Sequence, residues 1–251
     1  MLHSLVGLER HRLLATDGEI GRVRDFLVDD HDWTVRYLVA RTSGLGRDGR
    51  DVLISPISFG RVDADRRTLA LRIAREQVRT SPDIDTDRPV SRQHEADVHD
   101  HYDYRPYWRG PSLWGLGPFP GGLEPALVGP IDDLDAEALE RERAEREARL
   151  QTRRRRDDPH LRSVAELRGY RVHATDGDVR HVTDALADPR TWAIRHLVVQ
   201  AGHWWRGNEV LVSPASVTRV DRADSRVALD LTREWIRNGP RRAAADGDDA
   251  S

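Results

Sequence analysis

The 251-residue sequence contains no cysteine, which excludes disulfide bonds, thiol nucleophiles and cysteine-ligated zinc sites. It also contains no lysine, and all of its basic Lys/Arg residues are arginine. This excludes Schiff-base catalysis and a lysine-dependent phosphate-binding loop. No apolar run approaches the roughly 18 residues that a membrane-spanning helix needs. The first residues do not form a basic segment followed by an apolar one, so we expect no signal peptide and a cytoplasmic location.

Apolar residues are sparse at 38% of the chain, whereas 33% of the residues are charged. This balance disfavours one large core and favours several small domains or a partly unstructured chain. The formal net charge is only −3, so charge alone provides no drive toward nucleic acid or anionic lipid. We therefore expect no nucleic-acid partner, and no residue pattern predicts a cofactor.

An internal repeat organises the rest of the chain. The segment ATDGEIGRVRDFLVDDHDWTVRYLVA begins at Ala15, and ATDGDVRHVTDALADPRTWAIRHLVV begins at Ala174. After a one-residue slip, the alignment continues with DVLISPISFGRVD and EVLVSPASVTRVD. About 27 of roughly 68 aligned positions are identical, which is well above chance similarity. The chain therefore contains two copies of one domain.

Copy 1 (residues 1–82) and copy 2 (residues 159–240) both have the sequence pattern of a small β domain. Short runs of β-branched and aromatic residues alternate with turn formers such as Asp17-Gly18. The runs of copy 1 predict a short helix at 74–79 and six strands, at 12–15, 23–29, 33–40, 52–54, 59–62 and 68–73. The period of two places Trp33, Val35, Tyr37 and Val39 on one face. Six short strands predict a closed or nearly closed barrel, because closure removes exposed edges.

The sequence between the two copies is of a different kind. Residues 83–131 are rich in Pro, Gly, Asp, His and aromatic residues without a regular period, which predicts a loop-like linker. Residues 132–158 predict one charged helix, with acidic residues at its start, four arginines near its end and acid-to-arginine pairs four residues apart. Residues 241–251 predict a disordered tail.

The repeated motifs resemble the PRC-barrel family. In copy 1 the resemblance is carried by DGEIGRVRDFLVDDHDWTVRYLV at residues 17–39 and VLISP at residues 52–56. The matching residues are Asp17, Gly18, Asp25, Asp29, Trp33, Arg36, Ser55 and Pro56 in copy 1, and Asp176, Gly177, Asp184, Trp192, Arg195, Ser213 and Pro214 in copy 2. The linker segment PVSRQHE, with its Tyr-rich continuation, resembles the linker of tandem PRC-barrel proteins of bacteria. Copy 2 departs from the pattern at Arg180, Ala185 and Pro189.

The resemblance implies a fold of two small β-barrels and a role in protein interaction, since the known members of the family are interaction modules. The family includes the cytoplasmic domain of the photosynthetic reaction-centre H subunit. It also includes a domain of a small-subunit ribosome maturation factor. An accessory role in the light reaction, in peripheral contact with a membrane complex, is therefore one alternative function.

A cluster of histidines and carboxylates in the linker provides a second alternative, a metal-binding protein. His94, His99 and His101 lie among Glu and Asp residues, and imidazole and carboxylate are good ligands for zinc or nickel. His94 and His99 are five residues apart, which does not match the i, i+4 pair of helical zinc-protease sites. The favoured interpretation is a polar linker whose His and Tyr side chains pack on the barrels.

The repeated carboxylates and the Ser-Pro motifs do not form a coherent catalytic set. We interpret Asp17 as a turn residue that bonds to its own backbone, and Asp29-Asp30 as the end of a strand. Ser55-Pro56 and Ser213-Pro214 lack the G-x-S-x-G motif that exposes a nucleophile, and they predict turns at strand ends. The sequence therefore predicts a protein that is not an enzyme.

Aromatic residues are the candidate contacts with a partner. The candidates are Trp204, Trp205 and Arg206 before a strand of copy 2, and Tyr104, Tyr107 and Trp108 in the linker. Exposed Trp and Arg residues are frequent interface anchors, although both groups have the alternative of packing on the barrels. For the linker aromatics we favour packing across the two barrels. The preferred function is a non-catalytic adaptor that binds a protein partner or a second copy of itself.

Overall fold

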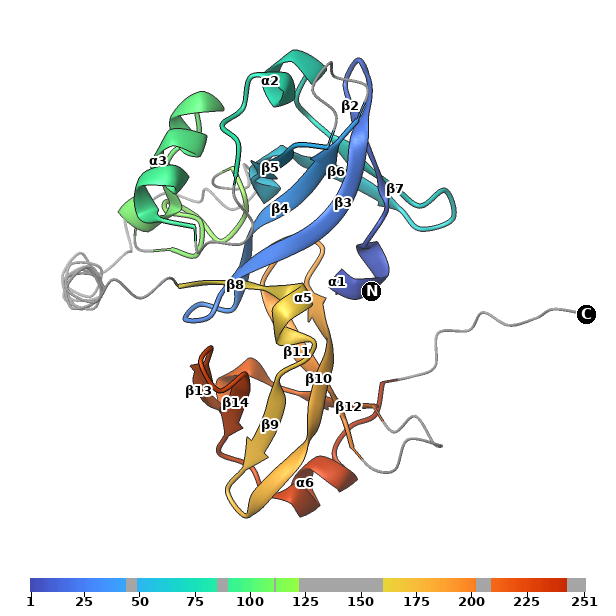
Figure 1. The fold of residues 1–251 in the computed structure, drawn as a ribbon, viewed down its shortest axis with the longest axis vertical. Coiled ribbons are helices and arrows are strands. Elements are labelled where there is room, and N and C mark those ends of the chain that lie inside the picture. The colour runs from blue at the N-terminus through green and yellow to red at the C-terminus, as the bar shows by residue number, and fades with distance from the viewer. Residues whose placement is uncertain (44–48, 85–89, 111, 122–159, 202–208, 243–251) are drawn as a thin grey trace, which may run out of the picture.

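The computed structural model describes residues 1–43, 49–84, 90–110, 112–121, 160–201 and 209–242. In this part of the chain the protein is mainly β, as the sequence predicts. It contains two seven-stranded sheets, which lie one above the other along the long axis of the molecule (Figure 1). Within the described ranges, no helix has both the length and the apolar character needed to cross a membrane. The charged helix predicted at 132–158 lies outside them.

Copy 1 has the six predicted strands, and the two longest extend further than their apolar runs. The strands are β2 (Arg12–Ala15), β3 (Gly18–Asp29), β4 (Thr34–Thr42), β5 (Asp51–Ile54), β6 (Phe59–Asp63) and β7 (Thr68–Leu71), followed by α2 (Arg75–Arg79). Their order in the sheet is β5-β4-β3-β2-β7-β6. All neighbours are antiparallel except the parallel pair β2–β7. Among the described residues no pairing joins β5 to β6, so the sheet follows an open path.

Copy 2 repeats this arrangement. Its elements are β9 (Arg171–Ala174), β10 (Gly177–Ala187), β11 (Ile194–Gln200), β12 (Glu209–Val212), β13 (Val217–Asp221), β14 (Arg226–Leu229) and α6 (Arg233–Asn238). The order β12-β11-β10-β9-β14-β13 is the equivalent path. Beyond α6, Arg241 forms a β-bridge with Val210, and the amide of Arg242 donates to the carbonyl of Glu209. The disorder predicted from residue 241 is therefore wrong for these two residues, which pair with the edge of β12.

The first strand of each copy joins the sheet of the other copy. The chain begins with β1 (His3–Ser4) and α1 (Leu5–Leu8), and β1 pairs antiparallel with β10 of copy 2. Copy 2 begins with β8 (Leu161–Ser163) and α5 (Val164–Leu167), and β8 pairs antiparallel with β3 of copy 1. Each sheet therefore has six strands of its own copy and a seventh from the other, which unites the two copies by reciprocal exchange.

Equivalent side chains secure the two exchanged segments. The hydroxyl of Ser163 donates to the carboxylate of Asp25 at 2.5 Å, and the hydroxyl of Ser4 donates to the carboxylate of Asp184 at 2.5 Å. Each serine also accepts a backbone hydrogen bond in the first turn of its own short helix. The carboxylates that the sequence pattern repeats thus hold the start of the opposite copy, which is a structural role.

A second reciprocal contact joins the turns that precede β4 and β11. The amide of Val35 donates to the carbonyl of Trp192 at 2.9 Å, and the amide of Ile194 donates to the carbonyl of Trp33 at 2.6 Å. Both tryptophans have left-handed backbone conformations, with φ of 48° for Trp33 and 57° for Trp192. This exchange of equivalent bonds places a pseudo-two-fold axis between the two turns.

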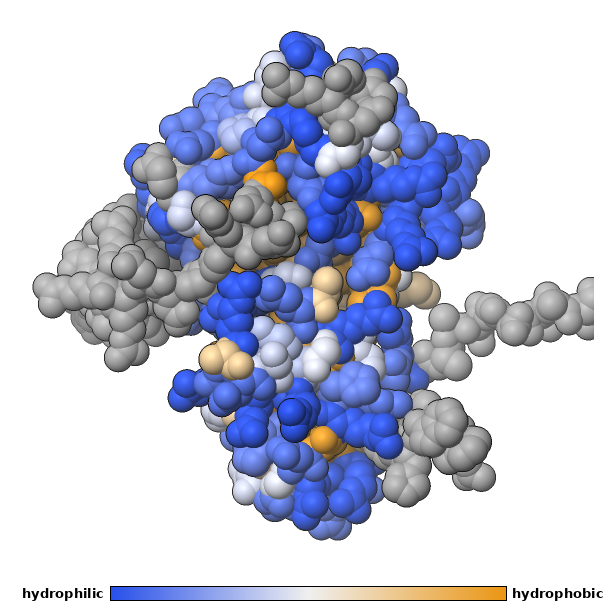
Figure 2. Space-filling view, in the orientation of Figure 1, coloured by the Kyte–Doolittle hydropathy of each residue, from blue (hydrophilic) through white to orange (hydrophobic). Residues whose placement is uncertain are grey.

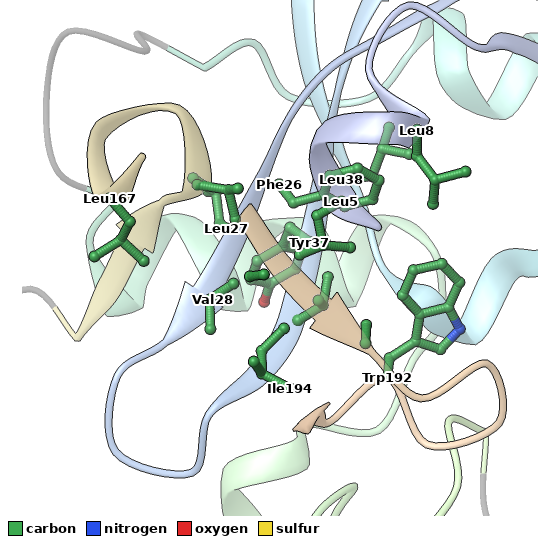
Figure 3. Packing of buried hydrophobic residues seen from close by; sticks show 14 of the residues in the cluster. Leu5, Leu8, Phe26, Leu27, Val28, Tyr37, Leu38, Leu167, Trp192 and Ile194 are labelled. Carbon is green, nitrogen blue, oxygen red and sulfur yellow. The ribbon is translucent and has the colours of Figure 1, made fainter. Parts of the chain in front are cut away.

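The hydrophobic core is continuous across the junction of the two copies. The Trp192 side chain, 3% exposed, reaches from copy 2 to the ring of Phe59 at 4.7 Å and the ring of Phe26 at 6.2 Å in copy 1. Figure 3 shows it beside leucines of α1 and the neighbouring strands. The visible outer surface is mostly hydrophilic, with small apolar patches, some of them near the junction (Figure 2).

The linker covers the outer face of β4. It contains the helix α3 (Arg92–His101) and the short turn η2 (Tyr107–Arg109), so the prediction of a purely loop-like segment at 83–131 is wrong for α3. The side chain of Ser91 caps this helix by accepting from the amide of His94 at 3.2 Å. The period of two predicts one buried face for β4, yet every residue from 34 to 40 is buried, because α3 and the segment after it cover the second face.

Neutralising Asp25 and neutralising Asp184, the two carboxylates that hold the exchanged segments, should change the stability of the protein by different amounts. Burial raises the pKa of Asp25 despite its hydrogen bonds to Ser163 and two backbone amides, so Asp25→Asn removes a costly charge. Asp184 also binds the guanidinium of Arg242 at 2.9 Å. We expect Asp184→Asn to lower the free energy of unfolding by about 2 kcal/mol and Asp25→Asn by less than about 1 kcal/mol. Urea denaturation at pH 7 measures the free energy of unfolding of both variants. Equal losses of stability would contradict the stronger stabilising role assigned to the ionised Asp184.

Candidate functional site

A buried polar cluster lies where the linker covers β4. At its centre is the carboxylate of Glu95 on α3, whose side chain is fully buried. The hydroxyls of Tyr37 and Tyr107 donate to Glu95 Oε2 at 3.1 and 2.6 Å. Glu95 Oε1 lies 3.1 Å from a guanidinium nitrogen of Arg92 and 3.2 Å from Nε2 of His160. Side chains from separate segments thus converge on one carboxylate, and we call this set the Glu95 cluster.

The protonation states of the Glu95 cluster follow from these contacts. Burial opposes ionisation of Glu95, but the hydrogen bond and charge of His160, together with Arg92, hold its pKa below the ordinary value. Burial and the adjacent carboxylate raise the pKa of Tyr37 and Tyr107 well above their usual value. At neutral pH an ionised carboxylate therefore accepts hydrogen bonds from two protonated phenols. This state stabilises the attachment of the linker.

Arg36 forms the other half of this polar interior. Its side chain is fully buried, and its guanidinium donates to the Leu113 carbonyl at 2.6 Å and to Asp32 at 3.0 Å. The guanidinium also lies 3.5 Å from the carboxylate of Asp29 and 3.9 Å above the ring of Tyr107. Burial opposes ionisation of Asp29, yet the charge of Arg36 keeps the pKa of that carboxyl below its ordinary value. The motif arginine thus ties the linker to β4.

A β-bulge explains why Arg36 and Tyr37 both meet the linker although they are neighbours in one strand. The register of the β3–β4 pair shifts between Leu27 and Val28, which leaves Arg36 as an extra residue in β4. Successive side chains of a regular strand point to opposite faces, whereas a bulge re-aims them. The bulge therefore allows one short stretch of β4 to supply both a cation and a phenol to the same side.

The three linker histidines have different surroundings. His99 is 1% exposed and is enclosed by aromatic rings, those of Tyr37, Tyr104, Tyr107 and Trp108, with centroids 5.0 to 6.2 Å away. His101, two residues further along α3, instead has its Nε2 2.7 Å from the carbonyl of Gln77 on α2. In the described ranges no group of three His, Cys, Asp or Glu side chains is arranged to hold a metal ion. The structure therefore does not gather His94, His99 and His101 as ligands of one metal ion, and the metal-binding alternative stays a prediction.

The linker aromatics assigned to a partner make contacts inside the chain. Tyr107 is 3% exposed and belongs to the Glu95 cluster, so it is not accessible to a partner. The hydroxyl of Tyr104 bonds to the hydroxyl of Ser58, and the half-buried ring of Trp108 lies 4.5 Å from the guanidinium of Arg92. Tyr104 and Tyr107 therefore fasten the linker to copy 1, whereas Trp108 packs on Arg92 within the linker.

The end of the linker reaches copy 2. The indole nitrogen of Trp114 donates to the carbonyl of Thr191 at 2.8 Å, and the guanidinium of Arg190 lies 4.9 Å from the ring centroid of Phe119. The linker aromatics therefore bridge the copies, in the manner expected for an aromatic linker. Trp204, Trp205 and Arg206 lie outside the described residues, and their partner role stays a prediction.

The motif acids and serines of the turns act on nearby backbone. The carboxylate of Asp17 accepts from the amide of Arg75 at 2.8 Å, so it fixes the start of α2 across the copy, and Asp176 makes the equivalent bond in copy 2. Ser55 and Ser213 cap short 3-10 turns that begin at the following prolines. These residues therefore shape the fold at the ends of strands.

Among the described residues the buried polar groups face one another and not an open cleft. Two shallow, open depressions, of about 330 and 510 Å³, lie on copy 2, and the larger is beside Trp235. A shared structural role for Arg92, Glu95 and His160 was not predicted from the sequence. No local signal identifies them, because the cluster exists only when the linker is folded against β4.

Comparisons with known proteins give one local match. No family model matches the sequence. An uncharacterised protein of Deinococcus radiodurans is 39% identical over 72 residues, which are 28% of this chain and 25% of that protein. The chain thus covers about a quarter of the length of this relative. The similarity is confined to one region, and it does not assign a family or an activity to the whole chain.

Proposed function

We propose that the protein is a non-catalytic adaptor of the PRC-barrel type, which binds a protein partner in the bacterial cytoplasm. The observation that carries this proposal is the reciprocal strand exchange, which combines two copies of one domain into a single unit. Such a unit presents two related outer surfaces. An adaptor needs surfaces held in a fixed relation to each other, and the continuous core provides this.

The barrel assignment rests on the sequence resemblance and on the course of the long strands. β3 pairs with β2 along residues 18–22 and with β4 along residues 21–29. One strand therefore belongs to two successive sheet segments and bends between them, and β10 does the same in copy 2. Strands that bend in this way wrap a sheet around a small core, which supports a barrel-like domain.

The structural contacts of the buried titratable groups support the proposal that the protein is not a catalyst. Glu95, Asp29 and Arg36 are buried and engage one another or the linker. Asp25 and Asp184 hold the exchanged segments. These groups stabilise the fold through their contacts with one another. Their abundance in the sequence can therefore be explained without an enzymatic role.

Affinity capture from host lysate tests the proposal. The purified wild-type chain is compared with a Trp204→Ala/Trp205→Ala variant, whose fold is checked by circular dichroism, and bound proteins are identified by mass spectrometry. We expect a stoichiometric partner that wild type retains and the folded variant loses. Catalytic turnover or a stoichiometric small-molecule cofactor in the purified protein would overturn the adaptor function.

A further inference from the structure

The end of α6 carries an asparagine followed by a glycine. The chain contains two asparagines, and only Asn238 has glycine as its next residue. Asn238 is the last residue of α6 and is exposed. Within the described ranges, neither its side-chain amide nor the backbone N–H of Gly239 has a hydrogen-bond partner. Solvent therefore reaches this pair of residues, and no hydrogen bond to a described residue holds either amide.

The packing of α6 on β12 requires glycine at position 239. A Cβ atom there would lie 2.9 Å from Cγ1 of Val210 on β12 and 3.2 Å from the carbonyl oxygen of Trp235. Glycine permits this close approach because it has no side chain. For the same reason, nothing on Gly239 hinders its backbone nitrogen from meeting the side-chain carbonyl of Asn238. The fold thus retains glycine at the position where it makes the preceding asparagine most reactive.

The segment that follows Gly239 is bound to the edge of β12. The carbonyl of Pro240 accepts from the amide of Leu211 at 2.8 Å, and the amide of Arg242 donates to the carbonyl of Glu209 at 3.0 Å. These bonds set one register between the segment and the strand. An additional main-chain atom between α6 and Pro240 would displace that register.

The same segment supports the contact between the two copies. The guanidinium of Arg242 lies 2.9 Å from the carboxylate of Asp184, which accepts from the hydroxyl of Ser4 at 2.5 Å and from the amide of Val6 at 3.1 Å. The Asp184 side chain is 3% exposed, so Arg242 supplies positive charge to a buried carboxylate. Displacement of Arg242 would leave that carboxylate poorly compensated and weaken its hold on the start of copy 1.

We propose that Asn238-Gly239 is a site of spontaneous deamidation, and that its isoaspartate product releases residues 240–242 from β12 and weakens the attachment of β1. The backbone nitrogen of Gly239 bonds to the side-chain carbonyl carbon of Asn238, and the side-chain nitrogen leaves as ammonia with the proton of the Gly239 amide. Water then opens the cyclic imide at one of its two carbonyl groups. One opening gives aspartate, and the other gives isoaspartate, whose main chain contains one additional carbon. Water is the only co-reactant, and the modification does not depend on the adaptor function.

Incubation of the purified full-length protein at mildly alkaline pH, followed by peptide mapping with mass spectrometry, tests the site. We expect Asn238 to be converted about tenfold faster than Asn208, because the glutamate after Asn208 has a side chain that hinders the attack. Asn238→Gln is the matched control, since glutamine would have to close a larger ring and should stay intact. Conversion of Asn238 no faster than that of Asn208 would overturn the site.

Amide hydrogen exchange tests the structural consequence. In the isoaspartate fraction we expect Leu211, Arg242 and Val6 to lose protection. Freshly purified Asn238→Asp, which has the added charge and a normal main chain, should keep the protection of wild type. Arg242→Ala should reproduce the loss at Val6 without incubation. Full protection of Leu211 in the isoaspartate fraction, or of Val6 in Arg242→Ala, would refute the proposed release.

Discussion

Deletion of residues 1–8 is expected to destabilise copy 2 as well as copy 1, with a total loss above about 4 kcal/mol. Leu5 and Leu8 are 0% and 6% exposed, and the loss of each buried leucine side chain costs about 2–5 kcal/mol. The deletion also removes β1 from the edge of β10 and the Ser4 hydroxyl from the buried carboxylate of Asp184. The damage should therefore appear in a sheet that lies more than a hundred residues further along the chain.

Urea denaturation followed by tryptophan fluorescence measures this loss, and amide hydrogen exchange of β10 reports on copy 2 separately. Leu5→Ala in the full chain should reproduce about 2–5 kcal/mol of the effect. Leu116→Ala is the matched control, because this leucine is 53% exposed and its truncation should change stability by less than about 0.5 kcal/mol. Wild-type protection of β10 in the deletion variant would show that the exchanged strand does not belong to that sheet.

Glu95→Ala is expected to lower the free energy of unfolding by about 3–5 kcal/mol and to release α3 from β4. The substitution leaves Arg92, His160 and two buried phenols without their shared acceptor, and breaking a buried ionic network in this way is strongly destabilising. Denaturation gives the energy, and faster amide exchange in α3 reports the release. Glu76→Ala, which removes an exposed glutamate whose carboxylate pairs with Arg79, should cost far less, because an exposed ion pair contributes little to stability.

Glu95 also determines how the stability of the fold is expected to depend on pH. Because the folded-state pKa of Glu95 lies below the ordinary value of 4.5, its ionised form stabilises the fold above that pH. This contribution is lost as the pH falls through the lowered pKa, where the folded protein must also take up the proton. We expect the stability of Glu95→Gln to fall less steeply over this acidic range. Identical slopes for wild type and Glu95→Gln would contradict the assignment of Glu95 as the ionised centre.

The strand pattern could be predicted because its causes are local. β-branched runs, the Asp17-Gly18 turn and the Ser55-Pro56 stop mark strand ends within a few residues, and the repeat transfers them to copy 2. The exchange of β1 and β8 could not be predicted in this way. The same short strand has the same sequence whether it pairs with its own copy or with the other, and only the three-dimensional path of the chain distinguishes the two.

The helix α3 and the Glu95 cluster were missed for a related reason. The face of α3 that contacts β4 includes Glu95 and His99, which a hydrophobic pattern reads as solvent-facing positions. Their burial is compensated by donors and rings from β4 and η2, and by His160, the residue before β8. A polar residue becomes a core residue only when those distant partners are in place, so its role is not encoded in its neighbours along the chain.

The reciprocal exchange also sets an order of events during protein synthesis. Asp25 and its partner Ser163 are 138 residues apart, so a ribosome adding about 5–20 residues per second needs on the order of ten seconds to supply β8 after β3 has been made. Throughout that interval copy 1 can form its own six strands, but the second half of β3 has no neighbour on one side. The nascent chain must therefore carry an open sheet edge until translation reaches copy 2.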